Sequence, residues 1–500
     1  MAERRYILAL DQGTSSSRAL IFDENAGVVA LAQRPTTQTY PKPGWVNQDA
    51  SEIWESTLAV TREVLHRSDI PADQIAAIGI TNQRETLVVW DRRSGRPVAP
   101  AIVWQSRQSQ PQVDSLVARG MTAAYQHVTG LVPDPYFTAT KISWLLEHHP
   151  ELRRRAETGE LLAGTVDSWL LWNLTAGAVH GTDVSNASRT MLFDIRALDW
   201  AAGLLSDLAI PGGMLPEIFP SSGQIAVSQP DLFGNGIPIT GIAGDQQAAL
   251  FGQTCFAPGE AKNTYGTGSF LLLNTGGMPR PSAHKLLTTI AWQVEGGVDY
   301  ALEGAVYVSG AAVQWLRDGL GLVEASGDVE ALAASVPDSG GVSFVPALTG
   351  LAAPHWDSYA RGTILGVTRG TTGAHIARAT LEAIAMQTRD VTDAMAKDGG
   401  IALTSLRVDG GAARNDLLMQ VQADLLGVPV VRPRNVETTA LGAAFLAGLG
   451  CGLWPSTAAL VDRWHVDRTF EPAISADERD SRYAIWRRAV ERSLHWAAQD

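Results

Sequence analysis

Lysine is scarce in this sequence of 500 residues, since only five of its 39 basic side chains are lysine and the rest are arginine. The lysines are Lys42, Lys141, Lys262, Lys285 and Lys397. No segment has the pattern Gly-x-x-x-x-Gly-Lys-Ser/Thr, which excludes a P-loop nucleotide site. Any phosphate-binding site in this chain must therefore use another kind of turn.

Cysteine and long apolar runs are scarce as well. The two cysteines, Cys255 and Cys451, are far apart and form no Cys-x-x-Cys motif, and the start of the chain has no signal-peptide pattern. These features predict a cytoplasmic protein in a reducing environment. The least charged stretch, 438–461, contains four glycines and Pro455, so it predicts a buried Ala/Gly helix and turn, with no membrane insertion.

Positive charge is in the minority. The chain has 39 basic and 52 acidic side chains, a formal net charge of −13 and a pI near 5.3, which argue against a nucleic-acid surface. An apolar share of 45% is ordinary for a globular protein, and 500 residues allow about two to four domains.

The first strong pattern is a hairpin. The apolar runs 6–10 and 19–22 have the length of strands, and the polar segment from Asp11 to Arg18 connects them. A third strand is expected at 28–32, a helix at 50–67, and strands at 75–80 and 87–90. Strands that alternate with helices indicate an α/β domain.

A similar order recurs in the second half. A strand is expected at 237–243, followed by Gly244-Asp245-Gln246-Gln247 and a helix, and then two strands, 260–264 and 270–274, joined by a Gly/Thr/Ser turn. Later a strand at 405–408 leads through 409–415 into a helix at 417–426. We interpret the chain as two related α/β halves that face each other across a cleft, with domains at 1–250 and 251–500.

The segment from Asp11 to Arg18 has the composition of a phosphate-binding turn. Its backbone N–H groups and hydroxyls are donors for phosphate oxygens, and a carboxylate at its rim suits hydrated Mg²⁺, which keeps most of its waters. The turn 265–269 offers the same donors, and an Asp-Gly-Gly follows the strand at 405–408. The alternative for each is a polar turn without a ligand; the three together favour a nucleotide site.

Several longer segments carry a resemblance to a known family. They are YFTATKISWLLEH from Tyr136, GTILGVTRGTTGAHIARATLE from Gly362, and the shorter DQGTSSSR, NQRET, DPYF, GDQQAAL, YGTGSF and DGGAARN. Spread over residues 6–450, they resemble the FGGY carbohydrate kinases. The resemblance implies an α/β fold of two ribonuclease-H-like domains, as in actin- and hexokinase-type ATPases, flanking a nucleotide cleft.

The same resemblance assigns the phosphoryl-transfer chemistry. Asp245 matches the catalytic base of the family, which takes the proton of the acceptor hydroxyl, although helix N-capping is an alternative role. Asp11 matches the carboxylate on the magnesium side, so Asp11 and Asp245 are the expected metal residues, with Mg²⁺ and ATP as the cofactors.

Acceptor recognition is expected at a loop between strands. Arg84 and Glu85 would offer donors and acceptors to neighbouring hydroxyls, and the resemblance places them beside Tyr136, Asp245 and Gln246 around glycerol. By pattern alone, such a pair is a solvated surface turn. Xylulose and gluconate kinases of the family usually have Gln-Met-His in this loop. Trp104 and Phe270 match the aromatic walls of the site, although either could be a plain core or rim aromatic residue.

The nucleotide residues implied by the resemblance lie in two groups. The phosphate clamps are Thr14, Ser15, Ser16, Arg18 and Thr267. The adenosine side is Gly310, Gln314, Gly411, Ala412 and Asn415, and of these Gly310 could simply begin a helix.

We therefore expect a Mg-ATP-dependent kinase of glycerol catabolism that forms sn-glycerol 3-phosphate, assembled as a homo-oligomer (dimer or tetramer). The alternatives are a kinase for another polyol or ketose, an ATP-driven switch of the actin or chaperone type, and a catalytically silent binding protein. The segment 231–237 has no basic residue, whereas related enteric enzymes carry an Arg-containing loop there, so inhibition by fructose 1,6-bisphosphate is expected to be weak or absent.

Overall fold

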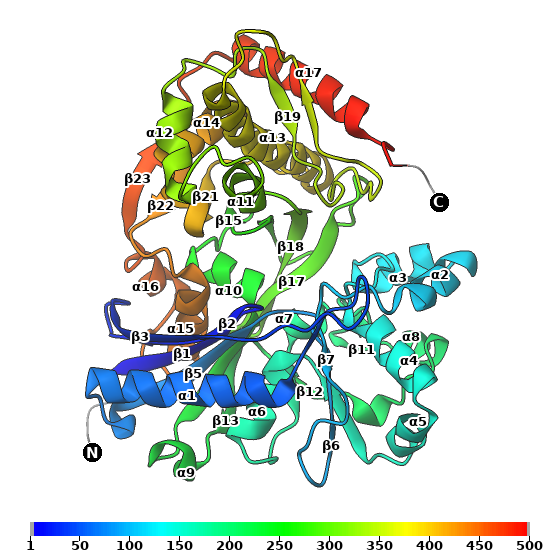
Figure 1. The fold of residues 1–500 in the computed structure, drawn as a ribbon. Helices are drawn as coiled ribbons and strands as arrows, with labels where there is room; N and C mark the ends of the chain where they lie inside the picture. Colours follow the sequence, from blue (N-terminus) through cyan, green and yellow to red (C-terminus); the bar gives the residue numbers. More distant parts are fainter. Residues whose placement is uncertain (1–4, 498–500) are drawn as a thin grey trace.

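The computed structural model describes residues 5–497, and two large sheets dominate it (Figure 1). The N-terminal sheet has six strands in the order β13-β14-β5-β1-β2-β3. Their bounds are β1 Tyr6–Gln12, β2 Ser16–Phe22, β3 Val28–Pro35, β5 Ile75–Asn82, β13 Ser222–Val227 and β14 Pro238–Gly244. The core strands β1 and β5 are almost entirely buried, because helices cover both faces of this sheet.

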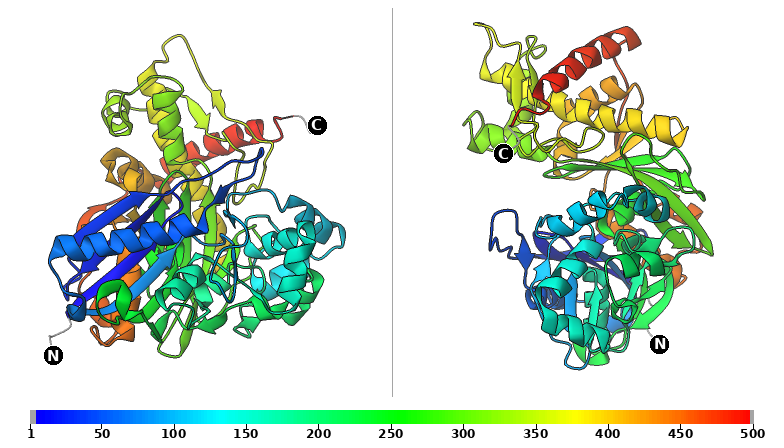
Figure 2. Two further views of the ribbon diagram at one scale, coloured as in Figure 1. Left: turned by 60° about the horizontal axis from the view of Figure 1, so that its bottom comes forward. Right: turned by 90° about the vertical axis from the view of Figure 1, so that its right-hand side faces the viewer.

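The C-terminal sheet has seven strands in the order β17-β18-β16-β15-β21-β22-β23. Their bounds are β15 Ala261–Tyr265, β16 Ser269–Gly276, β17 Leu287–Val294, β18 Gly297–Val306, β21 Leu406–Asp409, β22 Val430–Pro433 and β23 Val466–Phe470. In Figure 2 (right) the strands of this sheet lie in the upper half of the molecule and the blue N-terminal strands in the lower half.

The two sheets share one topology. In the first, β3, β2 and β1 are antiparallel neighbours, and β5 and β14 continue in parallel with β1. In the second, β18, β16 and β15 are antiparallel neighbours, and β21 and β22 continue in parallel with β15. This repeated order is the ribonuclease-H-like arrangement, and it supports the interpretation of two related α/β halves.

The first hairpin is tighter than expected from sequence. Asp11 pairs with Arg18 and Gln12 with Ser17 in the strand ladder, so these residues belong to β1 and β2 and the turn itself is only 13–15. Gly13 donates its N–H to the carbonyl of Ser16 at 2.9 Å, which closes the turn. The carboxylate of Asp11 is thus held by a rigid strand.

Long helices cover the sheets. α1 (Ala50–Ser68) packs on β2 and β3, and the Asp49 side chain caps it by accepting from the N–H of Ser51. α13 (Gly373–Gly399) and α14 (Asp416–Leu426) pack together over the C-terminal sheet, and α17 (Ala476–Ser493) packs against both. Between β5 and β14 the chain forms an additional region that includes β6 (Val88–Asp91), α4 (Thr138–His148), α6 (Val166–Leu174), β9 (Gly181–Asp183) and α7 (Val184–Ala187).

The apolar stretch near residue 440 forms α15 (Thr438–Gly450), which packs on α10 (Asp245–Gly252), β5 and β14 of the N-terminal sheet (Figure 1). The contact is close: a Cβ on Gly442 would lie 1.7 Å from the carbonyl oxygen of Ala248, so only glycine fits. The expected buried Ala/Gly helix is confirmed. Within residues 5–497, none of the helices combines the length and apolar character needed to traverse a bilayer.

Candidate active site

A cavity of about 480 Å³ lies between the two sheets, lined by residues of both. Ten of the residues singled out from sequence line it: Thr14, Ser15, Arg84, Glu85, Trp104, Tyr136, Asp245, Gln246, Thr267 and Phe270. The other eight, which do not line it, are Asp11, Ser16, Arg18, Gly310, Gln314, Gly411, Ala412 and Asn415. The cavity thus gathers the residues expected at the acceptor and part of those expected at the phosphates.

The carboxyl ends of β1, β5 and β14 position the acidic and basic groups of the site. These parallel strands are in register, with Gln12 level with Asn82 and Asn82 level with Gly244. Asp245 follows β14 directly, and Arg84 and Glu85 follow β5 by two and three residues. Because carboxyl ends of parallel strands meet at one sheet edge, residues far apart in sequence converge here.

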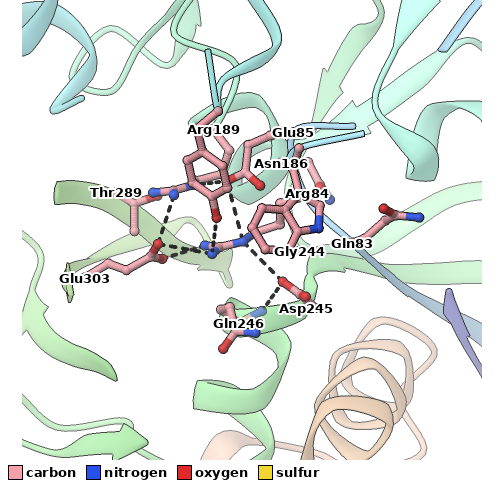
Figure 3. A network of polar contacts seen from close by, with 12 residues as sticks. Gln83, Arg84, Glu85, Asn186, Arg189, Gly244, Asp245, Gln246, Thr289 and Glu303 are labelled. Carbon is pink, nitrogen blue, oxygen red and sulfur yellow. Dashed lines mark hydrogen bonds and ion pairs between the residues drawn. The ribbon is translucent and has the colours of Figure 1, made fainter. Parts of the chain in front are cut away.

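Arg84 is the centre of a buried ionic network (Figure 3). Its Nη1 and Nη2 bind the two carboxylate oxygens of Glu303 at 2.5 and 3.1 Å, and its Nε lies 3.2 Å from Oδ1 of Asp245. Arg84 and Glu85 are only 2% and 1% exposed. The alternative of a solvated surface turn is therefore wrong for this pair.

Arg189, which follows α7, completes the network from a third side. Its Nε donates to Oε1 of Glu85 at 2.7 Å, and its Nη2 donates to Oε1 of Glu303 at 2.9 Å. Glu85 has a φ of +58°, a conformation that costs free energy for a non-glycine residue and is maintained by its surroundings. Gly244 contributes space, since a Cβ there would lie 2.7 Å from the Cγ and Cδ of Arg84.

Charges of opposite sign meet in this network, where Glu85, Asp245 and Glu303 lie near Arg84, Arg189 and Lys262. Arg107 and Asp134, which also line the cavity, form an ion pair of their own at 3.0 Å. Burial alone would raise the pKa of Glu303, but Arg189 and Arg84 lower it to about 2. Burial likewise opposes the charge of Arg84, yet Glu303 and Glu85 hold its pKa well above the usual value. Both groups are therefore charged at neutral pH.

Asp245 is prepared to accept a proton. Partial burial, with 29% of the side chain exposed, raises the pKa of its carboxyl group to about 6, against the opposing effect of Arg84, while Glu85 raises it further. Its Oδ1 accepts the N–H of Gln246 at 2.7 Å. Among residues 5–497 its Oδ2 has no hydrogen-bond partner, so this oxygen is available to a substrate hydroxyl. The helix cap is Gly244, and Asp245 is the first residue of α10.

Aromatic rings form one wall of the cavity. Trp104 packs edge-on against Tyr136 and Phe270, with ring centroids 5.5 and 6.4 Å apart. The indole Nε1 of Trp104 donates to Oγ1 of Thr14 at 2.9 Å, which connects this wall to the turn 13–15. Such a wall suits the carbon backbone of a small polyol.

Two further charges lie near Asp11, next to the turn 13–15. Arg18 forms an ion pair with Oδ2 of Asp11, and its Nη1 binds Oε2 of Glu437 at 2.5 Å. Oδ1 of Asp11 has no hydrogen-bond partner in the part of the chain that the structure describes. In that part no three His, Cys, Asp or Glu side chains are grouped for a metal. One or two carboxylates suffice for Mg²⁺, so the unpaired oxygens of Asp11 and Asp245 have the donor chemistry that a hydrated ion needs.

The turn 266–268, between β15 and β16, lies near one of the residues expected on the adenosine side, Gly310. The N–H of Gly310 donates to the carbonyl of Gly266 at 3.0 Å, so the start of α11 (Gly310–Asp318) lies against this turn. Gly410 lies against it from the other side, because a Cβ there would approach the carbonyl oxygen of Tyr265 within 2.3 Å. Gly411 and Gln314 are exposed. Asn415 caps α14 by accepting from the N–H of Leu418 at 2.8 Å.

The sequence patterns did not identify four residues of the site, which are Arg189, Gln247, Lys262 and Glu303. Gln247 accepts from Nη1 of Arg84 at 3.2 Å. Glu303 interrupts an otherwise apolar run in the second half of β18, and a charge at such a position needs a partner. That pattern could have marked Glu303, although it does not reveal the partner. Lys262 lies in the more polar strand β15, where no such signal exists.

Comparisons with known proteins find relatives that match nearly the whole chain. Family models described as the N-terminal and C-terminal domains of the FGGY family of carbohydrate kinases match residues 6–252 and 261–451. A glycerol kinase of Bordetella parapertussis is 57% identical over 99% of both chains, and one of Dechloromonas aromatica is 58% identical over 99% of this chain and 98% of its own. The crystal structure of Plasmodium falciparum glycerol kinase with ADP superposes with a TM-score of 0.92 at 36% identity, covering 98% of this chain and 99% of that chain.

Proposed function

Because the chain belongs to the FGGY family of carbohydrate kinases, we propose that it transfers the γ-phosphoryl group of ATP to glycerol, forming sn-glycerol 3-phosphate and ADP. The observation that carries the proposal is the convergence of Arg84, Glu85, Tyr136, Asp245 and Gln246 on one cavity with an aromatic wall. The named relatives, which match this chain over nearly its whole length, support the same substrate.

The polar atoms left free in the cavity suit a triol. Arg84 directs an Nη2 donor toward the hydroxyl of Tyr136 across 3.5 Å, a long contact that a substrate oxygen can replace. Oε1 of Glu85 is taken by Arg189, which leaves Oε2 as an acceptor. Each glycerol hydroxyl donates one hydrogen bond and can accept up to two, so a mixed set of donors and acceptors matches it.

In the proposed reaction, Oδ2 of Asp245 takes the proton of a primary hydroxyl as its oxygen bonds to the γ-phosphorus. The bond from that phosphorus to the bridging oxygen breaks, and ADP carries the electron pair away. The nearby Nε of Arg84 orients the carboxylate through Oδ1. Asp245 and Asp11 would hold Mg²⁺, which offsets phosphate charge when bound.

The remaining nucleotide contacts are assigned by position. The hydroxyls of Thr14, Ser15 and Thr267 line the cavity from opposite sheets and are donors for phosphate oxygens. The exposed turn at Gly411 and the start of α11 would contact adenosine. We propose that the two lobes close on the bound substrates and exclude water.

Release of ADP with and without glycerol tests this function. The proposal predicts that ADP release depends strongly on glycerol and that one glycerol 3-phosphate forms per ADP. An ATP-driven switch of the actin type would hydrolyse ATP equally in both conditions. Glycerol-independent hydrolysis would therefore overturn the proposal.

A further inference from the structure

Lys262, on β15, is a fully buried lysine that does not line the cavity. Its Nζ donates to Oε1 of Gln246, to Oγ1 of Thr264 at 2.9 Å and to the carbonyl of Phe270 at 3.3 Å. An ammonium group has three N–H donors and no acceptor, so these contacts saturate it. All three N–H donors of the lysine are therefore used by protein atoms, and none is left for a substrate.

This arrangement determines which end of the Gln246 amide faces the cavity. Because an ammonium group only donates, the atom facing it must be the carbonyl oxygen of Gln246. The amide nitrogen Nε2 has no hydrogen-bond partner within residues 5–497, and Gln246 lines the cavity. Without a fixed partner, rotation of the terminal amide would exchange its donor and its acceptor.

We propose that Lys262 is a positioning residue that fixes the amide of Gln246 so that it presents an N–H donor to a hydroxyl oxygen of the acceptor. This inference rests on the proposed function and adds to it a source of acceptor selectivity. Asp245 and Glu85 already supply carboxylate acceptors on the same cavity. A further acceptor would duplicate them, whereas a donor complements the lone pairs of a hydroxyl.

The C-terminal sheet thereby shapes the acceptor site. Gln246 is the second residue of α10, which follows the N-terminal sheet, whereas Lys262, Thr264 and Phe270 belong to β15 and β16 of the other sheet. The orientation of the amide thus depends on contact between the two halves of the chain. Lys262 can orient the Gln246 amide only when β15 of the second half packs against α10 of the first.

The test compares Lys262→Met, Gln246→Met and the double variant by steady-state kinetics. Methionine matches the length of glutamine, is one atom shorter than lysine, and removes the polar end of each side chain. For Lys262→Met we expect kcat/KM for glycerol to fall about tenfold, the effect of losing one oriented hydrogen bond. The loss should lie in KM for glycerol, with kcat and KM for ATP within about twofold of wild type, since the contact binds ground and transition states alike.

The double variant separates positioning from general structural damage. If Lys262 acts through Gln246, adding Lys262→Met to Gln246→Met changes kcat/KM for glycerol by less than about twofold. This comparison serves even if Lys262→Met alone does not fold, because removing donor and acceptor together leaves no unpaired group between them. Lys285→Met, at an exposed lysine, is the matched control and should behave as wild type.

Three results would overturn the inference. The first is an unchanged KM for glycerol in folded Lys262→Met. The second is a change confined to a lower kcat or a higher KM for ATP. The third is an equal loss of kcat/KM for glycerol when Lys262→Met is added to the wild type and to Gln246→Met. Each is distinct from failure of the proposed function, in which the wild-type protein itself would not phosphorylate glycerol.

Discussion

Glu303 of β18 and Arg84 of the loop after β5 form a two-point ion pair across the two halves of the chain, with N–O distances of 2.5 and 3.1 Å. Both side chains are at least 98% buried, with exposures of 1% and 2%. The same carboxylate binds Arg189. The guanidinium at the acceptor site is thus held by a strand of the other sheet, so the packing of the halves and the shape of the site are linked.

Glu303→Gln should reduce both stability and glycerol affinity. The neutral amide leaves two buried guanidinium groups without their shared counter-charge, and breaking a buried ion pair on one side costs about 3–5 kcal/mol. Urea unfolding should show a large loss of stability, and KM for glycerol should rise in the folded fraction. The exposed Glu217→Gln is the matched control. A variant with wild-type unfolding and wild-type KM would contradict the role of this pair.

Asp245→Asn should nearly abolish transfer. The amide cannot take the hydroxyl proton, and loss of a general base typically lowers the rate about 10²- to 10⁴-fold. ATP binding, measured by calorimetry, should remain close to wild type, because the phosphate-binding turns are unchanged. Asp231→Asn, on an exposed residue, supplies the control. Near-normal turnover in Asp245→Asn would require another base.

Stability should fall in mild acid because of His180. Burial lowers the pKa of this imidazole to about 4, and the ring lies edge-on against Trp90 with centroids 5.2 Å apart. The imidazole takes up a proton near pH 6.5 in the unfolded chain but not in the folded one. The contribution of neutral His180 to the free energy of unfolding is therefore complete above pH 6.5 and is lost as the pH falls toward 4. Between pH 7 and pH 5 the loss should be about 2 kcal/mol.

Comparison of His180→Gln with wild type at both pH values isolates this effect, because other titrating groups are common to the two proteins. The variant should lose less stability on acidification than the wild type does. His149→Gln, at a side chain that is 45% exposed, should retain the wild-type pH dependence. Equal acid sensitivity in His180→Gln and wild type would rule out the histidine as the cause.

Fructose 1,6-bisphosphate should inhibit weakly or not at all. The segment 231–237 contains no basic residue, and the cation that donates to its backbone is Arg62 of α1, whose Nε lies 3.3 Å from the carbonyl oxygen of Leu232. A single exposed guanidinium is a poor site for two phosphates. A clear fall in activity at millimolar inhibitor, lost in Arg62→Gln, would contradict this expectation.

Local patterns predicted most of the elements that carry the site. The apolar runs 6–10, 75–80 and 237–243 became β1, β5 and β14 within two residues at each end, because short buried strands have few alternatives in an α/β domain. The hairpin differed at its turn: strand pairing extends through Asp11 and Arg18, a feature of the backbone ladder that side-chain type does not reveal.

Local sequence patterns could not predict the buried ionic network around Arg84. Arg84 and Glu85 looked like a surface turn, since their partners Arg189 and Glu303 lie more than 100 residues away in sequence. Only the folded chain shows that each buried charge has a counter-charge. The orientation of Gln246 by Lys262 is invisible for the same reason, because it depends on which strand of the second sheet lies behind α10.

The most direct test of the central claim is a panel of phosphoryl acceptors, with kcat/KM measured for glycerol, dihydroxyacetone, glyceraldehyde, xylulose and gluconate at saturating Mg-ATP. The buried Arg84–Glu85 pair and the aromatic wall predict that glycerol has the highest kcat/KM and that xylulose and gluconate are at least about 100-fold poorer. A higher kcat/KM for xylulose or gluconate than for glycerol would contradict the account.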